Sequence, residues 1–117
     1  VSHMANELAS ELDHVFHALS DPTRRSVVQS LSQGPATVTA LAEPFSMALP
    51  TFLKHLKVLE TAGLVETQKR GRIRHCALRP HSLRAAEKWI GDHMVRWDAK
   101  LDSLERYLNE QDRREKG

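Results

Sequence analysis

Apolar residues recur at helical spacing over much of the chain, and these stripes define most of its elements. The stripe that predicts a helix over residues 5–19 consists of Leu8, Leu12, Val15, Phe16 and Leu19. Asp21 then suits the N-cap of a second helix and Pro22 its first position. This second helix runs through Leu31 and ends before Gly34.

Two further helices follow, separated by a short turn. Thr37 is placed to cap a third helix from Val38 to Phe45, which Pro44 keeps short. A fourth helix is predicted over Ala48–Ala62, with Gly63 as its stop. A short helix joined by a tight turn to a second helix is the arrangement that reads DNA, with the second helix in the major groove.

The two faces of the fourth helix differ in chemistry. The face expected to pack on the body carries Leu49, Phe52, Leu53, Leu56 and Leu59. The opposite face carries Met47, Pro50, Thr51, Lys54, Val58 and Thr61. Because a groove about 12 Å wide admits a helix only when nothing bulky protrudes, small and short polar groups suit close approach to base edges.

After Gly63 the period changes to that of strands. Leu64–Thr67 and Ile73–Leu78 are predicted strands, joined by the basic loop Gln68–Arg72. A long helix over Ser82–Leu108 closes the chain. Its apolar positions are spaced four and three residues apart, which is typical of a coiled-coil seam: Ile90, Met94, Trp97, Leu101, Leu104 and Leu108. The seam extends nearly 30 Å, too far for a small core to cover.

The pattern therefore predicts a mainly α fold with a small β-hairpin, a winged helix-turn-helix of order α-α-α-α-β-β-α. Since the seam needs a partner, we expect a homodimer paired through the first and last helices. The residues expected at the dimer interface are Leu8, Leu12, Trp89, Ile90, Met94, Trp97, Leu101, Leu104 and Leu108. For the two tryptophans, an effector pocket between helices is the alternative.

Length and composition agree with one domain. The 117 residues divide into a vector-derived segment 1–3, a domain over 4–110 that includes both dimerisation helices, and a frayed charged tail 111–117. The sequence has no apolar run long enough to span a bilayer and no secretory leader. With one cysteine the chain can form no internal disulfide, which fits the cytoplasm. No membrane partner is expected.

Charge is unevenly distributed although the net charge is only +2. Residues 1–23 contain four acids and no Lys or Arg, whereas residues 51–79 contain seven bases against two acids. This basic segment covers the fourth helix and the hairpin, and it favours a polyanionic partner over a merely solvated surface.

Double-stranded DNA is the partner that this arrangement suits. The residues proposed to contact it are Thr37, Thr39, Ala48, Pro50, Thr51, Lys54, His55, Lys57, Lys69, Arg70, Arg72 and Arg74. Thr51 and Lys54 would contact bases or phosphates, His55 and Lys57 phosphates, and the hairpin loop the backbone or minor groove. For Thr37 and Thr39 plain helix capping is the alternative role.

Three segments resemble one known family: "ALSDPTRRSVVQSL", "VTALAEPFSMALPTFLKHLKVLETAGLVE" and "KRGRIRHCAL". They are similar to the ArsR-type winged helix-turn-helix repressors, over roughly residues 12–80. The resemblance implies a homodimer that reads a palindromic operator near its own gene and is released by an inducer. The family's metal sites use paired cysteines on the third helix, or Asp-x-His with His-x-x-Glu on the last. This sequence has neither, so it resembles the branch that does not sense metals, with no cofactor and an unknown small-molecule inducer.

Other sites were weighed against simpler roles. His14 and His17 lie one turn apart and His93 lies beside Asp92, but neither pair has a third ligand, so no metal site is assigned. Cys76 is an inert core residue if it faces inward and a redox switch if it is exposed with a lowered pKa. A metal site at the histidines would make the protein a metal-responsive repressor, and a redox switch at Cys76 would make it a redox-responsive one. In both cases the site would differ from those of the family.

Two questions remain open to interpretation: the role of Arg24 and Arg25, and whether the protein is an enzyme or a binding module. These arginines either solvate the second helix or pair with acids of the first. No phosphate loop, nucleophile elbow or carboxylate pair indicates an enzyme. A winged helix that binds proteins is the remaining alternative, and the cationic hairpin favours nucleic acid over it.

Overall fold

The computed structural model describes the backbone of residues 2–116 and the side chains of residues 7–116. The chain divides into two compact units, Val1–Ala86 and Glu87–Gly117, and each is described by itself. Val1, in the expected vector-derived segment, and Gly117, in the expected tail, lie outside the described residues.

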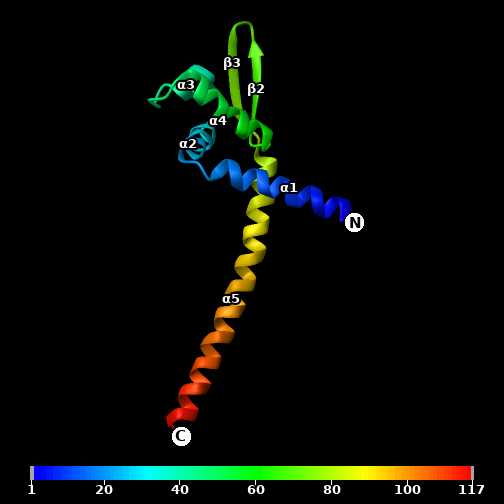
Figure 1. The fold of residues 1–117 in the computed structure, drawn as a ribbon, viewed down its shortest axis with the longest axis vertical. Helices are drawn as coiled ribbons and strands as arrows, with labels where there is room; N and C mark the ends of the chain where they lie inside the picture. The colour runs from blue at the N-terminus through cyan, green and yellow to red at the C-terminus, as the bar shows by residue number, and fades with distance from the viewer. Residues whose placement is uncertain (1, 117) are drawn as a thin grey trace. The chain divides into compact units, whose positions relative to one another are not determined.

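Seven elements and the start of an eighth build the first unit (Figure 1). They are α1 (Ser2–Leu19), α2 (Pro22–Leu31), β1 (Ala36–Thr37), α3 (Val38–Ala42), α4 (Leu49–Thr61), β2 (Val65–Arg70), β3 (Ile73–Leu78) and the first turns of α5 (Pro80–Lys116). The mainly helical winged helix-turn-helix predicted from the sequence is confirmed. One strand was missed, because two residues are too short to show a period.

The sheet has three antiparallel strands in the order β1-β3-β2. β1 pairs Ala36 with Cys76 and Thr37 with His75, which connects the start of α3 to the hairpin. The hairpin itself pairs Arg70 with Ile73, so its turn is only Gly71-Arg72 rather than the five-residue loop expected. Gly71 has a φ of 64°, the positive angle that a two-residue hairpin turn requires.

Helix ends follow local chemistry. α3 ends at Ala42, earlier than the expected Phe45. Glu43, its C-cap, still has helical angles, but Pro44 has no N–H with which to continue the helical hydrogen bonds. α4 ends in a Schellman motif in which Leu64 N–H donates to Leu59 C=O and Gly63 N–H to Glu60 C=O. Gly63 has a φ of 74°, and a Cβ there would lie 2.8 Å from Ser82 Oγ. Both the turn and the start of α5 therefore require glycine.

The core is built around the inner face of α4. Phe52, Leu56 and Leu59 are at most 1% exposed. They belong to a cluster with side chains of α1, α2 and the sheet, among them Val15, Val27, Leu64 and Cys76. Each element thus buries its apolar stripe against one helix, and the backbone of α4 is held firmly.

The structure corrects several side-chain assignments on α4 and α1. Leu49, expected on the inner face, is 53% exposed, while Met47 and Val58, expected outside, are half-buried against the core. Leu12, expected at the dimer interface, is buried in the core of its own chain and is not available to a partner. The helical period alone could not decide these cases, because half-buried positions lie at the edges of a stripe.

The second unit is the remainder of α5. The helix continues to Lys116, past the expected end at Leu108, so residues 111–116 are helical where a frayed tail was expected. Its buried residues, Ser82 and Ala86, both lie in the part of α5 that belongs to the first unit. No described helix is both long enough and apolar enough to cross a membrane.

The dependence of the fold on α4 can be tested by shortening one buried side chain. Leu56→Ala should lower the free energy of unfolding by about 2–5 kcal/mol, because it leaves a cavity in a close-packed core. Leu49→Ala on the same helix should change it by only about 0.5 kcal/mol, because Leu49 is exposed. Urea unfolding at one fixed protein concentration measures both. Equal losses would contradict the burial described here.

Candidate nucleic-acid interface

The N-terminal turn of α4 is the most accessible part of that helix. Ala48, Pro50, Thr51, Lys54 and Lys57 are all exposed, and three of them, Pro50, Thr51 and Lys54, belong to the outer face predicted from the sequence. Ala48 is the N-cap and accepts no side-chain cap hydrogen bond. The first-turn N–H groups therefore receive no side-chain cap from this residue, and uncapped N–H groups at a helix start favour an anion such as a phosphate.

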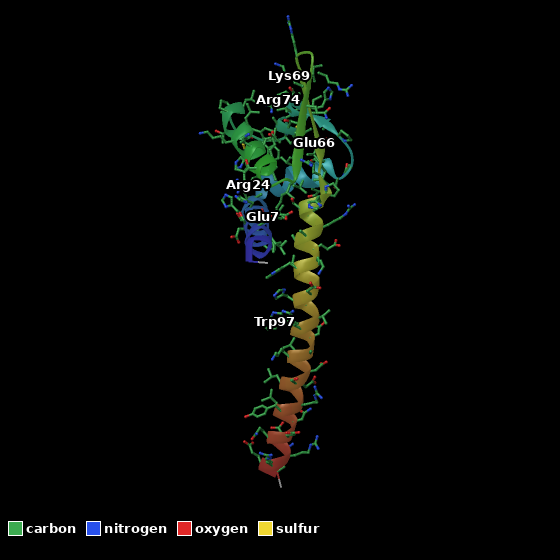
Figure 2. All side chains as sticks on the ribbon, turned by 90° about the vertical axis from the view of Figure 1, so that its right-hand side faces the viewer. Glu7, Arg24, Glu66, Lys69, Arg74 and Trp97 are labelled. Carbon is green, nitrogen blue, oxygen red and sulfur yellow. The ribbon has the colours of Figure 1, made fainter. Side chains whose placement is uncertain are left out.

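The hairpin places its cations beside this turn. Lys69, Arg70 and Arg72 are exposed near the hairpin end, and Figure 2 shows Lys69 projecting from its tip. A hollow of about 240 Å³ is lined by Thr39 at the start of α3, Leu49 at the start of α4 and Arg72 in the turn, among others. Residues far apart in sequence therefore share one surface, which carries short polar groups on the helices and positive charge on the hairpin.

Thr37 and Thr39 differ in their surroundings. The Oγ1 of Thr37 accepts a hydrogen bond of 3.1 Å from the N–H of Ala40, so Thr37 is the N-cap of α3. This is the capping role given above as its alternative. Thr39 is exposed and lines the hollow, and its contact with a phosphate stays a prediction.

Arg74 lies on the hairpin face that packs on α4, not at the tip. Its Nη2 donates to Thr67 Oγ1 at 3.1 Å and lies 3.6 Å from Glu60 Oε1. Thr67 Oγ1 in turn donates to Glu60 Oε1 at 3.2 Å. These three side chains fasten the base of the hairpin to the C-terminal half of α4, so the first role of Arg74 is to position the hairpin.

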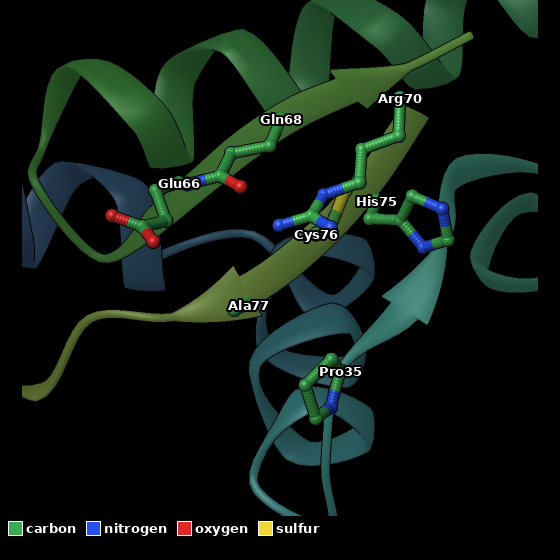
Figure 3. Close-up of a pocket in the computed structure, with 7 residues that line it drawn as sticks. All are labelled: Pro35, Glu66, Gln68, Arg70, His75, Cys76 and Ala77. Atoms are coloured by element: carbon green, nitrogen blue, oxygen red, sulfur yellow. The ribbon is translucent and has the colours of Figure 1, made fainter. Parts of the chain in front are cut away.

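The opposite face of the hairpin holds a second hollow of about 240 Å³ (Figure 3). Gln68, Arg70 and His75 line it, and Arg70 turns back over the strands between the other two. Arg70 thus adds its charge to the outer face of the hairpin rather than beyond its tip. Arg70 therefore lies on the face opposite the one that carries Arg74, and its expected contact with DNA stays a prediction.

His55 does not face outward as expected. Its side chain is half-buried, with Nδ1 3.0 Å from Arg24 Nη1 and 3.7 Å from Asp21 Oδ2. Because a guanidinium can only donate, Nδ1 is the acceptor of this contact. The expected phosphate contact of His55 is wrong for this conformation, since the imidazole is directed to the start of α2.

Arg24 is the centre of this junction, and both of its expected roles are wrong. It is buried, its Nε donates to Ala18 C=O at 2.7 Å, and its Nη2 donates to His17 C=O at 3.2 Å. These carbonyls belong to the last turn of α1, and His17 C=O also accepts from the N–H and the hydroxyl of Ser20. Arg25 completes the set by donating to Leu19 C=O at 2.8 Å.

Asp21 joins the same junction from the N-cap of α2. Its Oδ2 accepts from the N–H of Arg24 at 3.0 Å. Partial burial opposes ionisation, but this hydrogen bond and the charge of Arg24 outweigh it and lower the pKa of Asp21. The "SDPTRR" segment therefore ends one helix and begins the next, and Arg24 connects both to α4.

Cys76 and the histidines offer no obvious chemistry. Cys76 is 1% exposed and desolvation by burial raises the pKa of its thiol, so the structure supports the inert core reading. Among the described residues no three His, Cys, Asp or Glu side chains gather as a metal site would require. Asp92 is paired with Lys88, and His93 Nδ1 lies 2.8 Å from Trp89 C=O.

The seam residues expected at a dimer interface are exposed on the second unit. Ile90, Met94, Trp97, Leu101, Leu104 and Leu108 are 46–62% exposed within the described chain. Trp89 stacks on His93 with ring centroids 4.0 Å apart, and Leu8 of α1 is also exposed. Their contact with a partner stays a prediction.

Known proteins share this architecture. A family model described as a helix-turn-helix domain matches residues 19–68. The transcriptional repressor SdpR of Bacillus subtilis is 29% identical over 90 residues, which cover 77% of this chain and 100% of the repressor. The crystal structure of an ArsR family transcriptional regulator is 47% identical, covering 77% of this chain and 93% of that one with a TM-score of 0.74.

A solution structure from Mycobacterium bovis is described as a homodimeric winged helix-turn-helix DNA-binding domain and a possible ArsR-family regulator. It is 25% identical, covers 83% of this chain and 87% of its own, and has a TM-score of 0.61.

The junction at Arg24 can be tested by substitution with lysine, because lysine keeps the positive charge but lacks the several N–H donors of the guanidinium. Arg24→Lys should lower the free energy of unfolding by roughly 2–3 kcal/mol, since one ammonium cannot satisfy two carbonyls and an imidazole at separate positions. Arg25→Lys is the matched control and should cost less than about 1 kcal/mol, because Arg25 is exposed and makes a single bond. Equal costs for the two variants would contradict the junction.

The burial of Cys76 predicts slow thiol chemistry. In the native protein a disulfide reagent at pH 8 should modify Cys76 only as fast as the protein opens, and in denaturant it should react at once. The raised pKa acts in the same direction, because the thiolate is the nucleophile. Modification of the native protein at the rate of a free thiol would restore the redox-switch hypothesis.

Proposed function

Because the chain belongs to the ArsR family of transcriptional regulators, we propose that this DNA-binding repressor grips a palindromic operator as a homodimer. Each subunit would place the N-terminal turn of α4 in the major groove and the hairpin along the adjacent backbone. The observation that carries the proposal is the exposed turn around Thr51 and Lys54, held by a buried face and flanked by a basic hairpin.

The division of labour among the contacts follows from their chemistry. Lys57, Lys69 and Arg72 are exposed cations, so they would neutralise phosphates and supply affinity that falls with salt. Thr51 and Lys54 lie nearest the helix start and would touch base edges, with Pro50 and Leu49 offering apolar contact to a thymine methyl. Sequence choice would therefore come from a single helical turn.

The dimer follows from the need to meet two half-sites. A two-fold operator with half-sites one turn of DNA apart, about 34–36 Å, requires two recognition helices at that separation. The relative from Mycobacterium bovis is homodimeric, and the apolar seam of this chain is exposed over its whole length. Both support pairing of two copies through α1 and α5.

Release would require an inducer that favours a different angle between the two subunits, so that both half-sites cannot be met together. We propose an unidentified small molecule for this role and an operator near the protein's own gene. The protein would act where bacterial DNA lies, in the cytoplasm.

The function is tested by DNA binding to the region upstream of its own gene. In a gel-shift or anisotropy titration the protein should prefer this region to a random duplex, and the preference should weaken steeply with salt. Lys54→Ala with Arg72→Ala should reduce affinity by at least about tenfold and flatten the salt dependence by roughly one or two ions, because two cations leave the interface.

The matched control removes the same charge elsewhere. Arg84→Ala with Lys88→Ala changes two exposed cations of α5 and should leave affinity and salt dependence near those of the parent. If both double variants lose affinity equally, only general charge matters and the contact assignment fails. If the parent protein shows no preference over random duplex, a winged helix that binds proteins becomes the better interpretation.

A further inference from the structure

The outer face of the hairpin gathers polar side chains that the fold does not use. Side chains alternate between the two faces of a strand, and residues paired across two strands share a face. Glu66, Gln68 and Arg70 of β2 therefore share one face with Ala77 and His75, the partners of Glu66 and Gln68 on β3. Among the described residues, no hydrogen bond or ion pair engages the side chain of Gln68, Arg70 or His75.

These polar side chains lie around an apolar floor. The hollow of about 240 Å³ that they line is also lined by Pro35, Cys76 and Ala77, as Figure 3 shows. Cys76 is buried and Ala77 is half-buried, so the floor is continuous with the packed sheet. Sites for drug-sized ligands span about 300–1,000 Å³, so this hollow suits a smaller molecule. An apolar surface with a few polar groups at its edge is the general form of a ligand site.

The charges around the hollow select an anion. Arg70 contributes a planar guanidinium, which binds a carboxylate through two parallel hydrogen bonds. The side-chain amide of Gln68 and the ring N–H of His75 are further donors on the same face. Glu66 also lines the hollow, but its Oε2 lies 3.6 Å from Nε of Arg79, so its charge already has a partner. A ligand therefore meets an excess of positive charge.

We propose that this hollow binds a small aromatic carboxylate, with its carboxylate on Arg70 and His75 and its ring over Ala77 and Cys76. The carboxylate answers the excess of donors, and the ring answers the apolar floor. Guanidinium and imidazole groups are planar and stack on aromatic faces, which favours a flat ring over an aliphatic chain of similar size.

The consequence for regulation rests on the proposed function. Arg70 is one of the cations expected at DNA, and a bound carboxylate neutralises it and holds it on the outer face of the hairpin. Each subunit then brings one cation fewer to the phosphates, so the ligand weakens operator binding. This effect arises within one subunit and adds to any change of angle between two subunits.

The first arm of the test measures binding with sodium benzoate as the probe. Amide NMR spectra of isotope-labelled full-length protein should show shifts at Gln68, His75 and Ala77 with one dissociation constant of about 1 mM or tighter. Benzyl alcohol lacks the carboxylate and acetate lacks the ring, so each should bind at least about tenfold more weakly. Absence of shifts at the hairpin, or equal binding of acetate or inorganic phosphate, would overturn the site.

The second arm changes the hollow. Arg70→Gln removes its main charge and should weaken benzoate binding by at least about tenfold. Ala77→Val keeps every charge but adds two methyl groups to the floor, and it should weaken binding by a similar factor. Arg84→Gln removes an exposed cation of α5 as the matched control and should bind benzoate like the parent.

Arg70 is exposed, so Arg70→Gln keeps the proposal testable even where Ala77→Val does not fold. Benzoate binding that survives Arg70→Gln, or that falls equally with Arg84→Gln, would overturn the site.

The third arm reads the regulatory consequence by anisotropy titration of the upstream duplex at constant ionic strength. Saturating benzoate should weaken the affinity of the parent about threefold to tenfold and flatten its salt dependence by roughly two ions per dimer. In Arg70→Gln benzoate should have no further effect. Arg72→Gln leaves the hollow intact and should stay sensitive to benzoate, although its affinity for DNA starts lower.

The outcomes separate the site from the proposed function. The NMR arm needs no DNA, so absence of benzoate binding with operator preference intact would overturn the site alone. Benzoate bound at the hairpin without any change in operator affinity would refute the regulatory consequence. A parent protein that binds benzoate but shows no preference for the upstream duplex would refute the proposed function and leave the site standing.

Discussion

The whole first unit depends on the burial of one face of α4. This helix of thirteen residues has one face in the hydrophobic core and, in the function proposed above, the other face against a DNA duplex. Phe52, Leu56 and Leu59 give up nearly all of their surface to the core, and this removal of apolar area from water is the main force that holds the helix. The outer face can then stay small and polar without loss of stability.

Polar contacts at both edges of α4 also hold this helix. They are needed because burial of apolar surface alone does not fix the orientation of the helix. Glu60 connects it to the hairpin through Thr67 and Arg74, and His55 connects it to α1 and α2 through Arg24. Hydrogen bonds are directional, so these contacts restrict the rotation and sliding that a purely apolar interface would allow. Both edges of α4 are therefore bonded to neighbouring elements, the hairpin on one side and α1 and α2 on the other.

The second unit obeys a different constraint. A single helix of thirty residues has no core of its own, and its apolar stripe is covered by nothing in the described chain. Such a helix gains stability only by packing on another surface, because isolated helices are marginal in water.

The sequence by itself determined every element whose signal is periodic or capped. The stripes of α1 and α4, the caps Asp21 and Thr37, the stop at Gly63 and the paired strands of the hairpin were all predictable, because neighbours in sequence decide them. The basic surface and the exposed turn of α4 followed from the same patterns.

The tertiary structure alone decided which polar side chains are available. Arg24 and His55 read as surface groups from the sequence, yet they meet across 31 positions of sequence, and Arg24 also donates to a carbonyl at the end of α1. β1 exists only because β3 is there to pair with it, and Leu12 is taken by its own core. Unsatisfied carbonyls, strand partners and core space are properties of the folded chain, so no local pattern can report them.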